Sequence, residues 1–139
     1  MIYFDALALL PLLIADAHTE KASAWYSGLS ATVIVSDFAN LEVNAVLSRH
    51  LRVGRLTQGE VENALLDFDA MRANCERLSH AASDFLLAER LVRDFATKLA
   101  AADALHLASA KNAGATLATL DARLAEAARG QGVELAELA

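Results

Sequence analysis

The sequence predicts an α/β fold in which a short central parallel sheet is flanked by helices on both faces. Two observations lead to this fold class. Short apolar runs alternate along the chain with longer amphipathic runs, which is typical of strands that alternate with helices. One short run, residues 32–35 (TVIV), is β-branched and apolar throughout, as expected of a strand that is covered on both faces.

The chain begins with a strand and two helices. Residues 1–4 are expected to form a short buried strand. Residues 6–14 are expected to form a helix, in which Pro11 either kinks the axis or closes the first turn. A second helix is expected over residues 18–26, and it stops at Gly28, a residue type that favours the C-cap.

Two longer helices follow the β-branched strand. The first is expected over residues 37–51, and Ser36 immediately before it is a suitable N-cap. The second begins with a capping box formed by Thr57 and Glu60, and it is expected to run to Met71.

The second half of the chain continues the alternation. Strands are expected over residues 76–78, 115–119 and 133–135, and helices over residues 83–95, 101–113 and 122–129. The helix over residues 83–95 has a clear apolar face, which consists of Phe85, Leu86, Ala88, Leu91, Val92 and Phe95. No internal repeat, low-complexity tract or linker interrupts the pattern, so we expect a single domain over residues 1–139.

The chain is acidic and rich in apolar residues. Its 18 acidic and 12 basic residues give a formal net charge of −6. Contacts to phosphate dominate the affinity of nucleic-acid-binding modules, so this balance argues against a passive module of that kind. It does not exclude an enzyme that holds divalent cations, because bound metal reverses the local sign of the field. The apolar share of 55% indicates either a large core or a surface that meets another chain.

The sequence also bears on location. Cys75 is the single cysteine, so no internal disulfide forms, and no Cys/His cluster indicates zinc. The longest early apolar run, residues 6–15, is too short to span a bilayer, and no basic segment precedes it. We therefore expect a cytoplasmic protein without a membrane segment.

Two acidic residues follow predicted strands. Asp5 comes after the first strand, and Asp121 comes just after the strand over residues 115–119. Ligands of open parallel sheets bind beyond the carboxyl ends of the strands, which makes both residues candidates for a site. Each also precedes a predicted helix, where Asp is a favoured N-cap, so capping and function both stay open.

Glu42 lies on the stripe of its helix that is expected to pack against the sheet. The stripe consists of Phe38, Leu41, Ala45 and Val46. A carboxylate on such a face is costly unless it is paired or bound to a metal, which favours a functional role. The alternative is that Glu42 lies at the edge of the stripe and reaches water or an arginine.

Asp103 lies in the first turn of a helix that is otherwise almost entirely Ala and Leu. A helix N-terminus stabilises an anion, so a purely electrostatic role stays open. The run around Asp103 is nevertheless too hydrophobic for a first turn that faces solvent. His106, one turn further on, is interpreted as a structural residue that bonds Asp103 or a backbone carbonyl rather than as a ligand.

These four acids are expected to converge on one cleft as a metal site. Hard oxygen ligands without a Cys/His set select Mg²⁺ or Mn²⁺. Clustered carboxylates repel one another, so at least one of them should have a raised pKa without metal. With metal, such a pocket activates water and neutralises charge on a phosphodiester.

Four segments resemble the signature blocks of PIN-domain proteins. They are the apolar strand into Asp5, residues 36–42 (SDFANLE), residues 103–108 (DALHLA) and residues 119–124 (TLDARL). Each block alone is weakly specific. Their order and spacing, with the overall length, are similar to those of the VapC toxins of bacterial toxin–antitoxin pairs. The resemblance covers essentially the whole chain.

The resemblance implies a PIN-like three-layer sandwich that acts as a Mg²⁺-dependent endoribonuclease on RNA. It implies that Asp5 and Asp103 hold the metal. Glu42 and Asp121 would complete the acidic cluster, and Thr119 matches a polar position that supports the site. It also implies a homodimer that is inhibited by a VapB-like antitoxin, through a peptide inserted towards the acids.

RNA binding also requires basic residues. Arg49, His50, Arg52 and Arg55 lie close together at the end of the helix that carries Glu42. Our hypothesis is that Arg49 and Arg52 hold phosphates beside the cleft. The alternative is a solvated helix end, whose bases interact favourably with the helix dipole.

Two other functions are compatible with parts of the sequence. A PIN fold can be retained as an interaction module with little or no nuclease activity; the negative charge favours this, as does Leu7, where the family commonly has a small hydroxyl residue. A phosphotransfer domain with Asp5 as nucleophile is disfavoured, because Lys98 and Lys111 do not lie at obvious strand ends.

Overall fold

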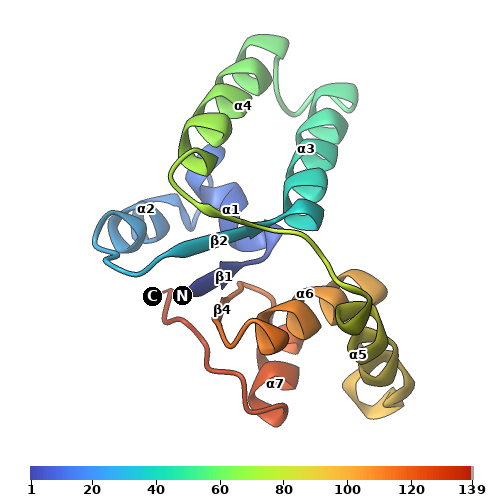
Figure 1. Cartoon of the computed structure of the whole chain (residues 1–139). Coiled ribbons are helices and arrows are strands. Elements are labelled where there is room, and N and C mark those ends of the chain that lie inside the picture. The colour runs from blue at the N-terminus through green and yellow to red at the C-terminus, as the bar shows by residue number, and fades with distance from the viewer. Residues whose placement is uncertain (139) are drawn as a thin grey trace.

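The computed structural model describes residues 1–138 and contains, within them, a four-stranded parallel sheet (Figure 1). The strands are β1 (Ile2–Phe4), β2 (Val33–Ser36), β3 (Glu76–Leu78) and β4 (Thr116–Ala118). They lie in the order β3-β2-β1-β4, and each neighbouring pair is parallel. The predicted α/β class with a parallel sheet is confirmed.

The helices match the sequence pattern closely. They are α1 (Ala6–Leu13), α2 (Thr19–Ser27), α3 (Asp37–Arg52), α4 (Gln58–Arg72), α5 (Ala82–Arg93), α6 (Ala101–Asn112) and α7 (Ala122–Gly130), with a short 3-10 helix, η1 (Phe95–Thr97). The capping box before α4 is present: the Glu60 amide donates to Thr57 Oγ1 at 3.2 Å, and the Thr57 amide donates to Glu60 Oε1 at 3.1 Å. Pro11 lies inside α1, which continues past it for two residues.

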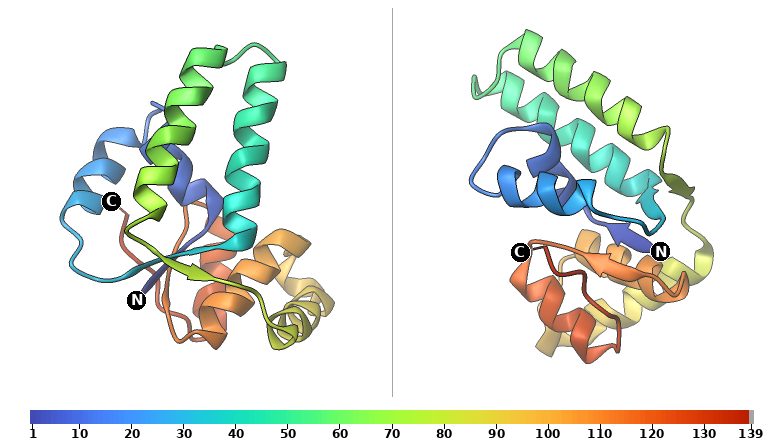
Figure 2. Two further views of the ribbon diagram at one scale, coloured as in Figure 1. Left: turned by 45° about the horizontal axis from the view of Figure 1, so that its top comes forward. Right: turned by 90° about the vertical axis from the view of Figure 1, so that its left-hand side faces the viewer.

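Helices cover both faces of the sheet, as two views show (Figures 1 and 2). Successive side chains of a strand point to opposite faces, so each strand contributes side chains to two hydrophobic cores, one on each face of the sheet. Phe4 packs among α1, α3 and α4, while Tyr3 packs among α5, α6 and α7. Because both faces of the sheet are covered by helices, a site that is open to solvent is expected at its edges or ends.

The expected strand over residues 133–135 is wrong. This segment makes only an isolated bridge between Leu135 and Leu117 of β4, supported by the Leu117 amide, which donates to Glu134 O at 2.8 Å. Only Val133 of the segment is buried, so pairing the whole segment with β4 as a strand would bury little additional apolar surface. Within residues 1–138, no helix is long and apolar enough to cross a membrane.

The expected apolar face of α5 is only partly buried. Ala88 and Leu91 pack into the core, whereas Phe85 is 58% exposed and Phe95, beyond the end of the helix, is 84% exposed. The buried face of α5 is therefore narrower than the apolar face that the sequence pattern predicts. The apolar side chains outside it remain on the surface, where another chain can cover them.

Phe68 of α4 has no exposed surface, so its replacement tests the packing of the helix layer that contains α1, α3 and α4. We expect Phe68→Ala to lower the free energy of unfolding by about 3–5 kcal/mol, because the missing ring leaves a cavity. Urea titration measures this change. Leu66 on the same helix is 67% exposed, and Leu66→Ala is the matched control, expected to stay within about 0.5 kcal/mol. Equal effects of the two variants would contradict the observed packing.

Candidate functional site

The strand register brings several polar residues to one end of the sheet. Phe4 of β1 lies beside Val35 of β2 and Ala118 of β4. The next residues along the chain are Asp5, Ser36 and Thr119, so three polar residues lie at the carboxyl ends of neighbouring strands. The candidate site is therefore built by the register of a parallel sheet.

Asp5 is almost completely buried, with 2% of its surface exposed. Its Oδ1 accepts a hydrogen bond from the Ala8 amide at 2.8 Å, which makes it the N-cap of α1, and its Oδ2 accepts one from the Thr119 hydroxyl. Burial raises the pKa of the Asp5 carboxyl from 3.8 to about 6, although both hydrogen bonds act in the opposite direction. An ionised Asp5 at neutral pH therefore costs folding free energy.

Thr119 connects the two acids that follow strands. Its hydroxyl donates to Asp5, and its Oγ1 accepts from the Asp121 amide at 3.0 Å. Asp121 is in turn the N-cap of α7, because its Oδ1 accepts from the Leu124 amide at 2.9 Å. Both acids thus serve as caps, the structural role that the sequence left open, and both also lie at the common end of the sheet.

Asp103 approaches the same region from the first turn of α6, where it is half-buried. Its carboxyl pKa is raised, first by burial and next by repulsion from Asp121; Glu42 adds repulsion, while His106 and Arg123 act the other way. Asp103 also contributes to the raised pKa of Asp5. Asp103 therefore lies within electrostatic reach of each of the other three predicted acids.

Glu42 is held by a chain of buried hydrogen bonds. Its Oε1 is hydrogen-bonded to Nε2 of His106. Nδ1 of His106 lies 2.7 Å from the Tyr3 hydroxyl, which donates to Ser36 Oγ at 2.9 Å. Tyr3, Ser36 and His106 are each at most 2% exposed. This chain fixes Glu42 at the rim of the acidic cluster.

Two expectations about this region are corrected. In the α3 stripe of Phe38, Leu41, Ala45 and Val46, Phe38 packs against the core, but Leu41 is 63% exposed and Ala45 is exposed. The buried positions of α3 are instead Ala39, Val43 and Leu47. Glu42 lies at the edge of the buried stripe, where it reaches a histidine rather than water or an arginine.

His106 is buried, and its partners are Glu42 and Tyr3 rather than Asp103 or a carbonyl. The polar partners Tyr3 and Ser36 were missed. The tyrosine in the apolar first strand could have indicated them, because a buried hydroxyl group needs a hydrogen-bond partner.

The acidic cluster fits a hard divalent cation in its chemistry. Its donors are carboxylate oxygens, and the pKa values of Asp5 and Asp103 are raised first by burial and further by repulsion between the acids, two effects that a bound cation would counter. Within residues 1–138, no three such side chains are already close enough to hold a metal ion. The Asp103 carboxylate accepts no hydrogen bond from a described residue, so it can turn towards a cation without breaking one.

Comparison with known proteins places this geometry in a family. Residues 2–130 match the PIN domain. The chain belongs to the PIN-domain family. Ribonuclease VapC45 of Mycobacterium tuberculosis is 34% identical to it over 139 residues, which cover 98% of this chain and 94% of the relative.

Solved structures show the same fold. VapC20 of Mycobacterium tuberculosis, a sarcin–ricin loop cleaving toxin, superposes on this PIN domain with a TM-score of 0.74 at 20% identity, covering 91% of this chain and 95% of VapC20. VapBC2 of Rickettsia felis bound to a promoter DNA fragment contains a chain that superposes with a TM-score of 0.73 at 17% identity, covering 98% of each chain.

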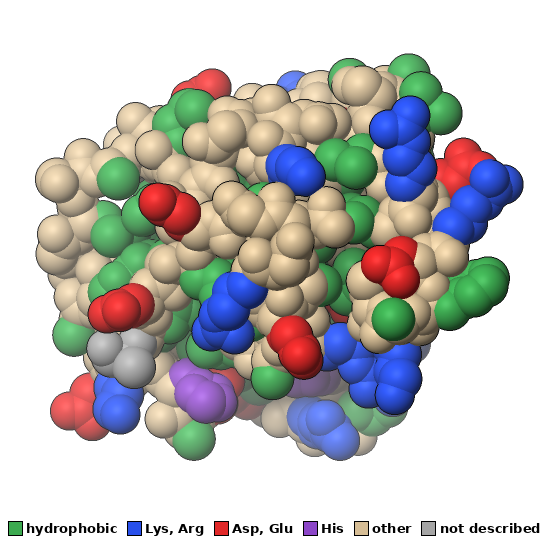
Figure 3. Space-filling model, turned by 90° about the horizontal axis from the view of Figure 1, so that it is seen from below, with side chains coloured by type: hydrophobic (Ala, Val, Ile, Leu, Met, Phe, Trp, Pro, Cys, Tyr) green, Lys and Arg blue, Asp and Glu red, His purple; other side chains and the backbone are tan. Residues whose placement is uncertain are grey.

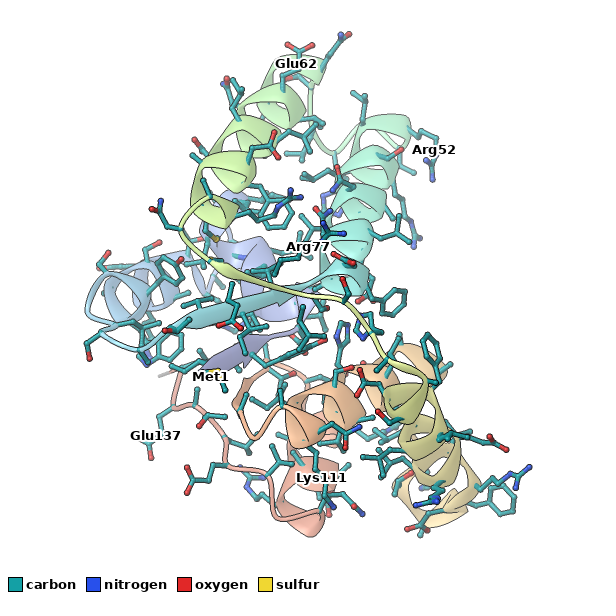
Figure 4. The ribbon with its side chains drawn as sticks, viewed as in Figure 1. Met1, Arg52, Glu62, Arg77, Lys111 and Glu137 are labelled. Carbon is teal, nitrogen blue, oxygen red and sulfur yellow. The ribbon has the colours of Figure 1, made fainter. Side chains whose placement is uncertain are left out.

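Basic residues at two places in this PIN domain bear on the phosphate-binding hypothesis. Arg49 and Arg52 are exposed in the last turn of α3, and Arg52 Nη1 donates to Ser48 Oγ at 2.8 Å. Figure 4 shows Arg52 at the end of α3 that is remote from the sheet. Arg123 was not singled out from the sequence, yet its charge acts directly on Asp103. Its position, two residues after Asp121, was the available signal.

Asp5→Asn should stabilise the metal-free protein at neutral pH. The pKa of Asp5 is raised on folding, so the folded state binds the proton more tightly and stability falls as pH rises from about 4 through about 6. We expect Asp5→Asn to be more stable than wild type by about 1–3 kcal/mol at pH 7.5. Thermal unfolding in chelator measures the difference, which should shrink towards pH 4; a difference that stays constant with pH would show that the charge of Asp5 is not its cause.

Proposed function

We propose that this PIN domain is a Mg²⁺-dependent endoribonuclease, with Mn²⁺ as a substitute, which hydrolyses RNA phosphodiester bonds as the toxin of a VapBC-like pair. The observation that carries the proposal is the cluster of Asp5, Glu42, Asp103 and Asp121 at the carboxyl end of the sheet. The 34% identity to a named ribonuclease over nearly the full chain supports it.

The proposed roles follow from how each acid is held. Asp5 and Asp103 hold the cation, because one is fixed by two hydrogen bonds and the other is free to turn. Each oxygen of Asp5 accepts one hydrogen bond and so retains a lone pair for a cation. Glu42, fixed by His106, and Asp121, fixed by its cap, complete the cluster, while Thr119 orients Asp5.

A divalent cation held by these acids would supply Lewis-acid activation of water and charge compensation on the phosphodiester. The residues of the chain provide a fixed, partly dehydrated anionic pocket for it. Arg123, whose charge acts on Asp103, is placed to attract the phosphate of an approaching strand.

The proposal includes two protein partners, a VapB-like antitoxin and a second copy of the chain. Exposed apolar side chains on and after α5 support it, since Phe85, Leu86 and Phe95 are each more than half exposed. A groove of about 650 Å³ between α5 and α6 adds apolar surface from Phe38 and Leu105. We further propose a cytoplasmic location, where RNA and a co-expressed antitoxin are available, and one domain over residues 1–139.

The alternative is a PIN-fold interaction module with little or no nuclease activity. Leu7 favours it, because this side chain in the first turn of α1 is 48% exposed and apolar where a small hydroxyl residue is common in the related toxins. Metal binding separates the two functions, because a catalytic cluster gains thermal stability from Mg²⁺ by mass action.

Asp103→Asn should abolish RNA cleavage. Removing one carboxylate from the proposed metal pair should lower the rate of Mg²⁺-dependent cleavage at least a hundredfold, and the rise in melting temperature with Mg²⁺ should disappear. Cleavage of structured RNA and thermal unfolding provide the two measurements. Asp67→Asn, at an exposed position of α4, is the matched control and should behave as wild type. Cleavage that resists both chelator and Asp103→Asn would refute the proposal.

Arg49 and Arg52 test the hypothesis about phosphate binding. Arg49 follows Glu42 by about two helical turns and therefore lies on the same side of α3. Replacing both arginines by Ala should reduce the slope of log affinity against log salt by about 0.7 for each phosphate that these side chains neutralise. The control is Arg90→Ala with Arg93→Ala on α5, which removes the same charge elsewhere. An unchanged salt dependence of RNA binding in the α3 variant would contradict the hypothesis.

A further inference from the structure

A cavity that none of the four acids lines has no role in the proposed cleavage chemistry. It has a volume of about 420 Å³, which falls in the range of small-molecule sites, about 300–1,000 Å³. Residues from α1 and α2 form one side, and α7 with the segment after it forms the other. Thr119 belongs to the lining, and the same side chain donates to Asp5. Thr119 therefore connects the cavity with the acidic cluster.

An aromatic side chain stands in this cavity. Trp25 of α2 lines it and is half-buried. The Trp25 ring is held by Phe4, a buried residue of β1, at a centroid separation of 5.6 Å. An indole that is fixed by the core and still lines a cavity provides a flat apolar surface on which a nucleobase can stack.

The charge of the lining is opposite to that of the chain. His18, Lys21 and Arg129 line the cavity, and Glu137 is its one acidic residue among those the structure describes. In the view from below, a histidine lies on the surface with basic, acidic and hydrophobic side chains near it (Figure 3). In a protein of net charge −6, a cavity with basic residues and an aromatic wall favours an anionic ligand that carries a ring.

We propose that this cavity binds one nucleotide of the RNA substrate, with its base against Trp25 and its phosphate towards Lys21 and Arg129. The proposal rests on the proposed ribonuclease function and adds the subsite that holds the strand next to the cleaved bond. Thr119 supports this placement, because it lies between the cavity and Asp5. Any base can stack on an indole, so this subsite contributes affinity for single-stranded RNA rather than sequence specificity.

Trp25 provides its own probe, because it is the only tryptophan of the chain. We expect a short oligoribonucleotide, added to the full chain in chelator so that no cleavage occurs, to quench the Trp25 fluorescence saturably. Adenosine monophosphate should quench it more weakly and should compete with the oligonucleotide. Quenching by the mononucleotide that RNA does not displace would indicate a site for free nucleotides and overturn the proposal.

Two sets of variants separate binding from folding. Lys21→Ala with Arg129→Ala, both at exposed positions, should weaken oligonucleotide binding about tenfold, whereas Arg90→Ala with Lys111→Ala should leave it unchanged. Trp25→Leu should raise the KM for RNA cleavage about tenfold at similar kcat, and Trp25→Phe should restore most of it. Cleavage with an unchanged KM in these variants would refute the subsite and leave the nuclease standing; quenching without any cleavage would refute the nuclease alone.

Discussion

The candidate site depends on the buried chain of hydrogen bonds that runs from Glu42 through His106 and Tyr3 to Ser36. Its members come from α3, α6, β1 and β2, so the chain ties together helices from both layers and two strands at one end of the sheet. Each buried polar group left without its partner would cost about 1–3 kcal/mol. The position of Glu42 is therefore as firmly set as the packing of the core.

The acids themselves oppose folding. Asp5 and Asp103 have raised carboxyl pKa values because burial and mutual repulsion disfavour their charged forms. The fold offsets part of this cost by giving Asp5 and Asp121 a second use as helix caps. A carboxylate that caps a helix and also faces the acidic cluster is disfavoured in its charged form but fixed in position, as the proposed metal site requires.

Local patterns predicted the elements well, because capping and side-chain periodicity are properties of neighbouring residues. The capping box of Thr57 and Glu60 and the Ser36 cap are present as expected. The patterns predicted less well which apolar residues are buried. Leu41 and Phe85 fit an apolar helical stripe and yet are exposed, since the orientation of each helix is set by the layer against which it packs.

The sequence by itself determined the fold class and the family, and it predicted the four acids, because these rest on residue types at fixed spacings. The tertiary structure alone decided the hydrogen-bond partners of those acids. His106 bonds Glu42, and Thr119 bonds Asp5, over long separations in the chain that only the register of the sheet and the seating of α6 bring together. The cavity beside Trp25 has the same origin, because its walls come from opposite ends of the sequence and no local pattern encodes their meeting.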